Sequence, residues 1–176
     1  MIDHLIGEHR KVEGLLAQLK DSDEGSDRNA MFEELASSLD THMRVEERYI
    51  YPMISDLIGQ DEASDATDEH ELARDGLASA RTRLEEGAFE AAIEILEAGI
   101  AHHVEEEEQE LFPQLRVKAA DQLDGMDPER LEAHVEEHGA AIDLTKEELY
   151  DLAKQQGIEG RSKMTKDELA GAVGRS

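Results

Sequence analysis

The chain has 176 residues, which is enough for one domain with a small appendage. Its 44 acidic and 18 basic side chains give a formal charge of −26, which repels phosphate backbones and disfavours nucleic-acid binding by most of the chain. Cysteine is absent, and this excludes disulfides, thiolate zinc sites and iron–sulfur clusters. No apolar run approaches the ~20 residues of a membrane span, and the start lacks a signal-peptide layout, so we expect a cytoplasmic protein without a membrane partner.

Four segments carry apolar residues at the three- and four-residue spacing of amphipathic helices. These segments are 2–19, 32–57, 66–84 and 89–115. The apolar stripe of the second segment includes Tyr49, Met53 and Leu57. Short polar connections between long helices favour antiparallel neighbours. We therefore predict an all-α fold in which residues 1–122 form an up-down four-helix bundle.

The charge changes abruptly near the C-terminus. Residues 1–140 hold 37 acidic and 12 basic side chains, whereas residues 141–176 hold 7 and 6. This step predicts a separate helical module over 143–176, after a linker with a short helix at 123–142. Two helices of the module are expected to begin at Thr145 and Thr165, each followed three residues later by a glutamate that completes a capping box.

The bundle sequence contains an internal repeat of 61 residues. Adding 61 to the positions of His9, His42 and Glu46 gives His70, His103 and Glu107, all on the apolar stripes. The same shift converts Glu8 to Glu69, Glu47 to Glu108, Tyr51 to Phe112 and Pro52 to Pro113. Two such helix–loop–helix halves packed about a pseudo-twofold axis would bring four histidines and two glutamates together.

These residue types favour a pair of metal ions. A histidine and a glutamate four residues apart point inward from consecutive turns, so a carboxylate can span two ions while each imidazole caps one. Imidazole and carboxylate suit iron, manganese or zinc, and buried carboxylates without cations would repel each other. The predicted ligands are His9, His42, Glu46, His70, His103 and Glu107, with no separate catalytic residue assigned. A lone inward histidine is more often a hydrogen-bonded core residue, but six polar residues in two matched copies favour metal.

Other sites are less well supported. A ferritin-type centre needs Glu-x-x-His, and none of the eight histidines has a glutamate three residues before it. His134 and His138 have the spacing of a zinc pair, but we favour an acidic linker helix there. The prolines at 52 and 113 are expected to kink their helices near the site. Tyr49 and Glu110 are 61 residues apart and break the symmetry, and we interpret them as a packing residue and an outer hydrogen-bond acceptor.

The segments THMRVEERYIYP (41–52) and HHVEEEEQELFP (102–113), together with EH at 8–9 and 69–70, resemble the hemerythrin-like HHE cation-binding proteins over about residues 1–120. The resemblance implies a four-helix bundle with two carboxylate-bridged non-haem iron ions, held by the six residues named above. Manganese and zinc are the alternatives. The invertebrate oxygen carriers have a further histidine where this chain has Arg74, so four histidines and a more symmetric site are expected here.

That resemblance implies oxygen, peroxide or nitric oxide as the small ligand and leaves open whether the protein is an enzyme. The alternative function is a non-enzymatic oxygen or iron sensor, or an iron store, that signals through the C-terminal module. LTKEELYDLAKQQGIEGRSKMTKDELAGAV, at about 143–173, resembles the Rho termination factor N-terminal-like module, which is related in shape to SAP domains. Such modules often accompany nucleic-acid binding. Here Lys154, Arg161, Lys163 and Lys166 supply only a weak basic patch, so a packing or protein-interaction role is favoured.

Overall fold

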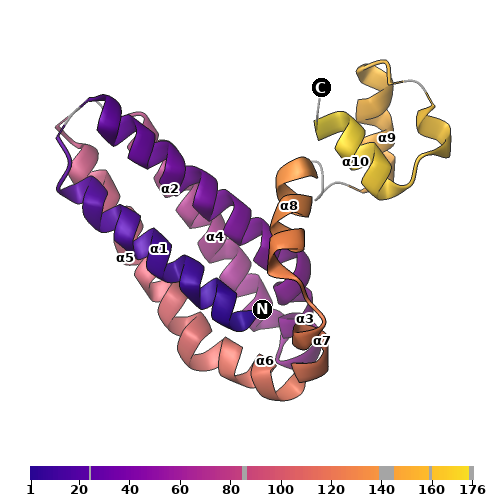
Figure 1. Ribbon diagram of the computed structural model, residues 1–176, viewed down its shortest axis with the longest axis horizontal. Coiled ribbons are helices and arrows are strands. Elements are labelled where there is room, and N and C mark those ends of the chain that lie inside the picture. The colour runs from indigo at the N-terminus through magenta and orange to yellow at the C-terminus, as the bar shows by residue number, and fades with distance from the viewer. Residues whose placement is uncertain (24, 85–86, 139–144, 159, 175–176) are drawn as a thin grey trace. The chain divides into compact units, whose positions relative to one another are not determined.

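A computed structural model describes residues 1–176 except 24, 85–86, 139–144, 159 and 175–176 (Figure 1). The described residues form helices and connecting turns, and none of them lies in a strand. The chain divides into two compact units, 1–126 and 127–176, which are treated separately below. None of the helices in the described part is long and apolar enough to cross a bilayer.

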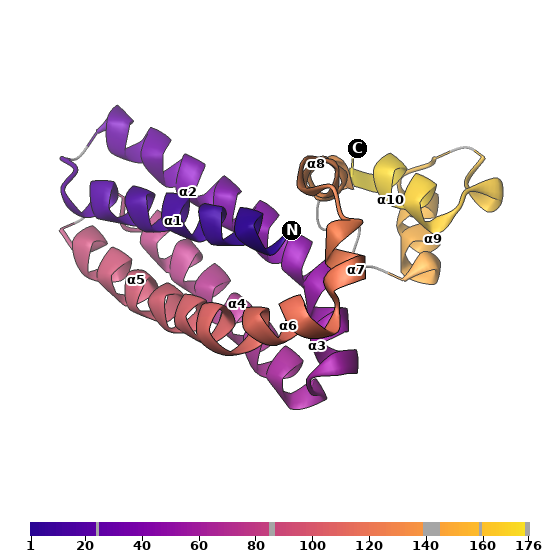
Figure 2. The same ribbon diagram turned by 60° about the horizontal axis from the view of Figure 1, so that its bottom comes forward.

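Four long helices build the first unit (Figures 1 and 2). They are α1 (Ile2–Lys20), α2 (Ser26–Val45), α4 (Gln60–Arg81) and α5 (Phe89–Glu106). Helix α1 packs against α2 and α5, and α4 packs against α5 and α2, so each helix has two neighbours around a shared core. This is the predicted all-α, up-down four-helix bundle.

Helices α2 and α5 each continue into a five-residue π-helical segment. These are η1 (Glu46–Ile50) and η2 (Glu107–Leu111), followed by α3 (Tyr51–Leu57) and α6 (Phe112–Lys118). The N–H groups of Tyr51 and Phe112 donate to carbonyls five residues back, at Glu46 and Glu107. Each proline then lies in the first turn of the following helix, where a backbone N–H is not needed. The sequence predicted kinks at the prolines but not these wide turns before them.

The wide turn η1 changes which side chains face the core. A π-helical turn holds one more residue than an α-helical turn, which rotates every later side chain about the axis. Ile50, Tyr51 and Ile54 are therefore buried, whereas Tyr49, Met53 and Leu57 are only partly buried. The apolar stripe expected for the second segment was wrong beyond Glu46, because an unbroken α-helical period does not hold there.

The apolar core fills the part of the bundle away from the prolines. Phe32 on α2 and Phe89 on α5 are buried with an edge-to-face contact, their ring centroids 6.2 Å apart. The guanidinium of Arg28 covers the Phe89 ring at 4.8 Å, and that of Arg81 covers Phe32 at 5.3 Å. Burying each phenylalanine contributes roughly 1.5–3 kcal/mol, so this core holds α2 and α5 in the register that positions the residues beyond it.

A short helix, α7 (Ala120–Asp124), ends the first unit. The second unit contains α8 (Pro128–His138), α9 (Lys146–Gln155), the 3₁₀ turn η4 (Arg161–Lys163) and α10 (Lys166–Gly174). Leu149, Ala153, Leu169 and Ala170 form its small core. The capping box at Thr165 is confirmed, because its N–H donates to Glu168 Oε2 at 2.7 Å and its Oγ1 accepts from the Glu168 N–H at 3.2 Å. The side chains of Glu148 and His138 lie outside the described residues.

Candidate metal centre

Six ionisable side chains from four helical segments meet inside the bundle. They are His9 on α1, His42 on α2, Glu46 at the start of η1, His70 on α4, His103 on α5 and Glu107 at the start of η2. All six are buried, and both glutamates are fully inaccessible to solvent. The structure therefore brings together all six residues that the sequence predicted as ligands.

The six side chains form two adjoining groups. The first contains His9, His42, Glu46 and Glu107, and the second contains Glu46, His70 and His103. Within each group one ligand atom from every residue lies within 4.8 Å of the others. Glu46 belongs to both groups. Glu107 Oε2 lies 3.4 Å from His9 Nε2 and 3.6 Å from His103 Nε2, so this carboxylate also lies between the two groups.

A second layer of glutamates holds the four imidazoles. His9 Nδ1 lies 2.8 Å from Glu108, His42 Nδ1 3.2 Å from Glu8, His70 Nδ1 2.9 Å from Glu47, and His103 Nδ1 2.9 Å from Glu69. A carboxylate only accepts hydrogen bonds, so each Nδ1 donates and the neutral tautomer leaves a lone pair on Nε2. This arrangement fixes the orientation of a metal-binding imidazole and raises its basicity.

The inward nitrogens then face one another in pairs. His9 Nε2 lies 3.1 Å from His42 Nε2, and His70 Nε2 lies 3.2 Å from His103 Nε2. Both oxygens of Glu46 and the Oε2 of Glu107 are buried without a hydrogen-bond partner. Lone pairs at that distance repel, and a buried carboxylate without a partner is costly. The donor set therefore requires positive charge at its centre, as a metal ion or as a proton.

The directions in which the pKa values shift in the metal-free site also indicate a need for positive charge among the carboxylates. Burial lowers the pKa of His42, but the carboxylates of Glu46 and Glu8 outweigh it and raise that pKa well above 6.5. Burial raises the pKa of Glu46, but His42 and His70 outweigh it and hold the pKa well below 4.5. A proton on His42 thus compensates the buried carboxylates when no metal is bound.

Tyr51 is a site residue that the sequence did not identify. Its hydroxyl lies 2.8 Å from His70 Nε2 and 3.2 Å from Glu107 Oε1, inside the second group. Phe112, its counterpart in the repeat, instead stacks on His9 with ring centroids 5.9 Å apart. The pair Tyr51 and Phe112 was visible in the sequence, but an α-helical register placed Tyr49 inward instead. The two groups therefore differ by one hydroxyl.

Several other candidates lie outside both groups. Tyr49 is only partly buried, and Glu110 is exposed, so neither belongs to the six-residue cluster. The side chain of His102 is 64% exposed and lies near Glu69 and Glu106. Arg74 lies where the oxygen carriers have a further histidine, and it forms an ion pair with Glu47 at 2.8 Å. Arg74 thus supports the glutamate layer instead of supplying a donor.

Residues 1–115 match the family described as the hemerythrin HHE cation binding domain. The chain belongs to the hemerythrin HHE family. Its hemerythrin domain is a cation-binding domain, and it contains a buried cluster of histidines and glutamates that could hold a metal ion. Residues 143–173 match the N-terminal domain of the Rho termination factor, so both sequence resemblances are confirmed. No curated protein and no solved structure matches the chain.

Proposed function

We propose that the hemerythrin domain holds two non-haem iron ions and that this centre binds or reacts with oxygen, peroxide or nitric oxide. His9 and His42 would hold one ion, His70 and His103 the other, and Glu46 and Glu107 would be shared. The observation that carries the proposal is the pairing of inward-facing imidazole nitrogens at 3.1 and 3.2 Å beside two buried carboxylates, with Glu46 Oε2 3.0 Å from His42 Nε2. Imidazole and carboxylate donors suit iron, with manganese and zinc as the alternatives.

Bound iron would supply a redox change and open coordination positions for a small ligand. The protein supplies fixed donors, because the four outer glutamates hold each imidazole through Nδ1. The hydroxyl of Tyr51 provides a hydrogen-bond donor between His70 of the second group and Glu107 of the first. Burial of the cluster excludes bulk water from the donors. These features support a site for a small ligand, whether that ligand is carried, sensed or consumed.

The direct test is elemental analysis of the purified protein together with its visible spectrum under air and under reductant. We expect two iron ions per chain after iron loading and a charge-transfer band that depends on oxygen. The Glu46→Gln variant should lose at least one ion, whereas Glu110→Gln, with the same charge change at an exposed position, should keep both. Binding of fewer than two ions, or no colour after loading, would contradict a di-iron centre.

Turnover separates the enzyme from the sensor. An enzyme consumes peroxide or nitric oxide catalytically when iron-loaded, and the His42→Ala variant loses this activity while the exposed His102→Ala variant keeps it. A sensor or iron store shows negligible turnover.

The second candidate is a sensor in which the C-terminal unit, whose residues 143–173 match the Rho N-terminal domain, transmits the metal state. Its test is limited proteolysis of that unit. Equal cleavage rates in metal-free and iron-loaded protein would argue against it. Nucleic-acid binding by that unit is the less favoured role, because its described basic residues are few and Arg161 is bound to the Ile158 carbonyl at 2.9 Å. Retention of DNA or RNA at low salt, lost at high salt, would establish it.

A further inference from the structure

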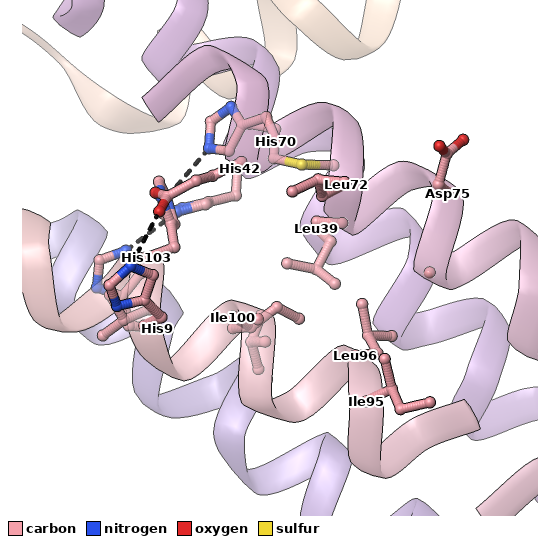
Figure 3. A pocket seen from close by; sticks show the side chains of 18 of the residues that line it. His9, Leu39, His42, His70, Leu72, Asp75, Ile95, Leu96, Ile100 and His103 are labelled. Atoms are coloured by element: carbon pink, nitrogen blue, oxygen red, sulfur yellow. Dashed lines mark hydrogen bonds and ion pairs between the residues drawn. The ribbon is translucent and has the colours of Figure 1, made fainter. Parts of the chain in front are cut away.

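A cavity of about 460 Å³ opens between α4 and α5 and reaches the metal centre (Figure 3). The four histidines gather at its inner end, and Leu39 and Ile100 line its middle. Leu72 and Ile95, which also line it, are 70% and 74% exposed. The cavity therefore connects the protein surface with the imidazoles along a wall that is mostly apolar.

The internal repeat shows that several residues lining this cavity differ from their counterparts in the other half of the bundle. Positions along its wall can be compared with those 61 residues earlier, between α1 and α2. Ala73, Gly76 and Gly99 correspond to Val12, Leu15 and Ser38. Val12 and Leu15 are buried in the main core, whereas Ala73 and Gly99 line the cavity and the side chain of Leu96 packs against Gly76. The cavity is thus a local change in an otherwise repeated design.

The residues at the entrance of the cavity also differ from their counterparts in the first half of the bundle. In the first half, Lys11 lies 3.7 Å from Glu34 and donates to Ser38 Oγ at 2.9 Å, which bridges α1 and α2 with polar groups. Their counterparts at the cavity entrance are Leu72 and Ile95. Isolated exposed leucines are ordinary on protein surfaces, but these two share one opening that leads inward. The second half thus has an apolar opening where the first has a polar closure.

Volume and charge indicate what fits. Pockets for organic ligands measure about 300–1,000 Å³, and an apolar cavity of about 150 Å³ already holds benzene. A cavity of 460 Å³ is therefore much larger than a diatomic gas requires. Glu69 and Asp75 line it, and lysine and arginine are absent from its described lining, so an anion such as a fatty acid is disfavoured.

We propose that this cavity binds a neutral, apolar organic molecule whose inner end lies against His70 and His103. The proposal rests on the cavity and its entrance and does not require bound metal, so it goes beyond the di-iron function. The ligand would gain affinity by removing Leu72 and Ile95 from water at the opening.

The test uses the full-length, metal-free protein and the neutral fluorescent probe N-phenyl-1-naphthylamine. We expect saturable binding of one probe per chain, and at least tenfold weaker binding of the anionic 8-anilinonaphthalene-1-sulfonate. Two variants should each reduce the affinity at least tenfold. Ala73→Leu fills the wall, and the double variant Leu72→Lys/Ile95→Glu rebuilds the polar bridge of the other half. Gly76 is unsuitable, because a Cβ there would lie 2.9 Å from a methyl carbon of Leu96.

Gly14→Leu is the matched control, because it adds a leucine at an exposed helical position where a Cβ meets nothing within 4 Å. This variant should bind the probe as the parent does. The double variant changes only exposed side chains, so it reports on the entrance even if Ala73→Leu fails to fold. Absence of saturable binding, or equal affinity in the parent and the double variant, would overturn the proposal. Because the assay contains no metal, its outcome is separate from the iron content that tests the di-iron centre.

Discussion

Replacing Glu47 by glutamine should weaken metal binding at the second group without removing a ligand. Glu47 accepts from His70 Nδ1 at 2.9 Å and is itself held by Arg74 at 2.8 Å. A hydrogen bond to a charged group contributes about 1.5–3 kcal/mol, and a neutral one about 0.5–1.5 kcal/mol. The loss is therefore about 1–2 kcal/mol, or roughly a 5- to 30-fold fall in affinity at 1.36 kcal/mol per tenfold. This lies at the lower end of the ~10–100-fold cost typical of such outer-layer changes.

The assay is competition for Zn²⁺ against a chromophoric chelator, which avoids oxidation of the metal. The affinity of the protein for one of the two ions should fall, while its affinity for the other ion stays the same, because Glu47 contacts only one of the four imidazoles. Glu71→Gln on α4, the helix that carries His70, makes the same charge change at an exposed position and is the control. Equal weakening in both variants would refute the reasoning, because the effect would then come from net charge and would fall with added salt.

Three further predictions concern protonation and capping. Burial and the charges of Glu107 and Glu46 raise the pKa of Tyr51 well above 10.0, so an ultraviolet titration of metal-free protein should show a tyrosine that ionises late, and Tyr51→Phe should remove that late step. The pKa of His42 is raised in the folded, metal-free protein. Its protonation therefore contributes its full share to the free energy of unfolding below pH 6.5, and this contribution is lost as the pH rises through the raised pKa. Metal binding near pH 7 should accordingly release protons, with affinity rising with pH, and a pH-independent affinity would contradict this. Thr165→Ala should destabilise α10 by about 1 kcal/mol, seen as faster amide exchange in that helix and not in α4.

The sequence predicted the bundle and its cluster because both follow from periodic patterns. The apolar stripe of the fourth segment is buried throughout, including Ile93, Ile100 and Leu115. The six clustered residues were found by arithmetic on a repeat, which requires only that similar halves pack similarly. Their service as iron ligands stays a prediction for the metal analysis above.

Two parts of the site were not predicted from the sequence. The π-helical turns were not predicted, and Tyr51 was missed because the second stripe was continued at Tyr49 instead of at Ile50, the counterpart of Leu111 in the repeat. The outer glutamates were visible as repeated pairs, but their partners were not. Glu8 precedes His9 in the chain and yet bonds to His42 on another helix, because adjacent residues point in different directions around a helix. Such cross-helix contacts depend on packing and not on spacing along one segment.

The positions of the two wide turns also bear on how the two halves of the chain arose. Because η1 and η2 begin at positions that differ by the same 61 residues as the clustered side chains, each half carries its additional residue at the same place. An insertion made separately in each half would have to occur twice at one position. A single insertion in an ancestral helical hairpin, followed by duplication of its gene, gives both turns at once. The difference in bulk between Ala73, Gly76 and Gly99 and their counterparts in the first half would then have arisen after the duplication.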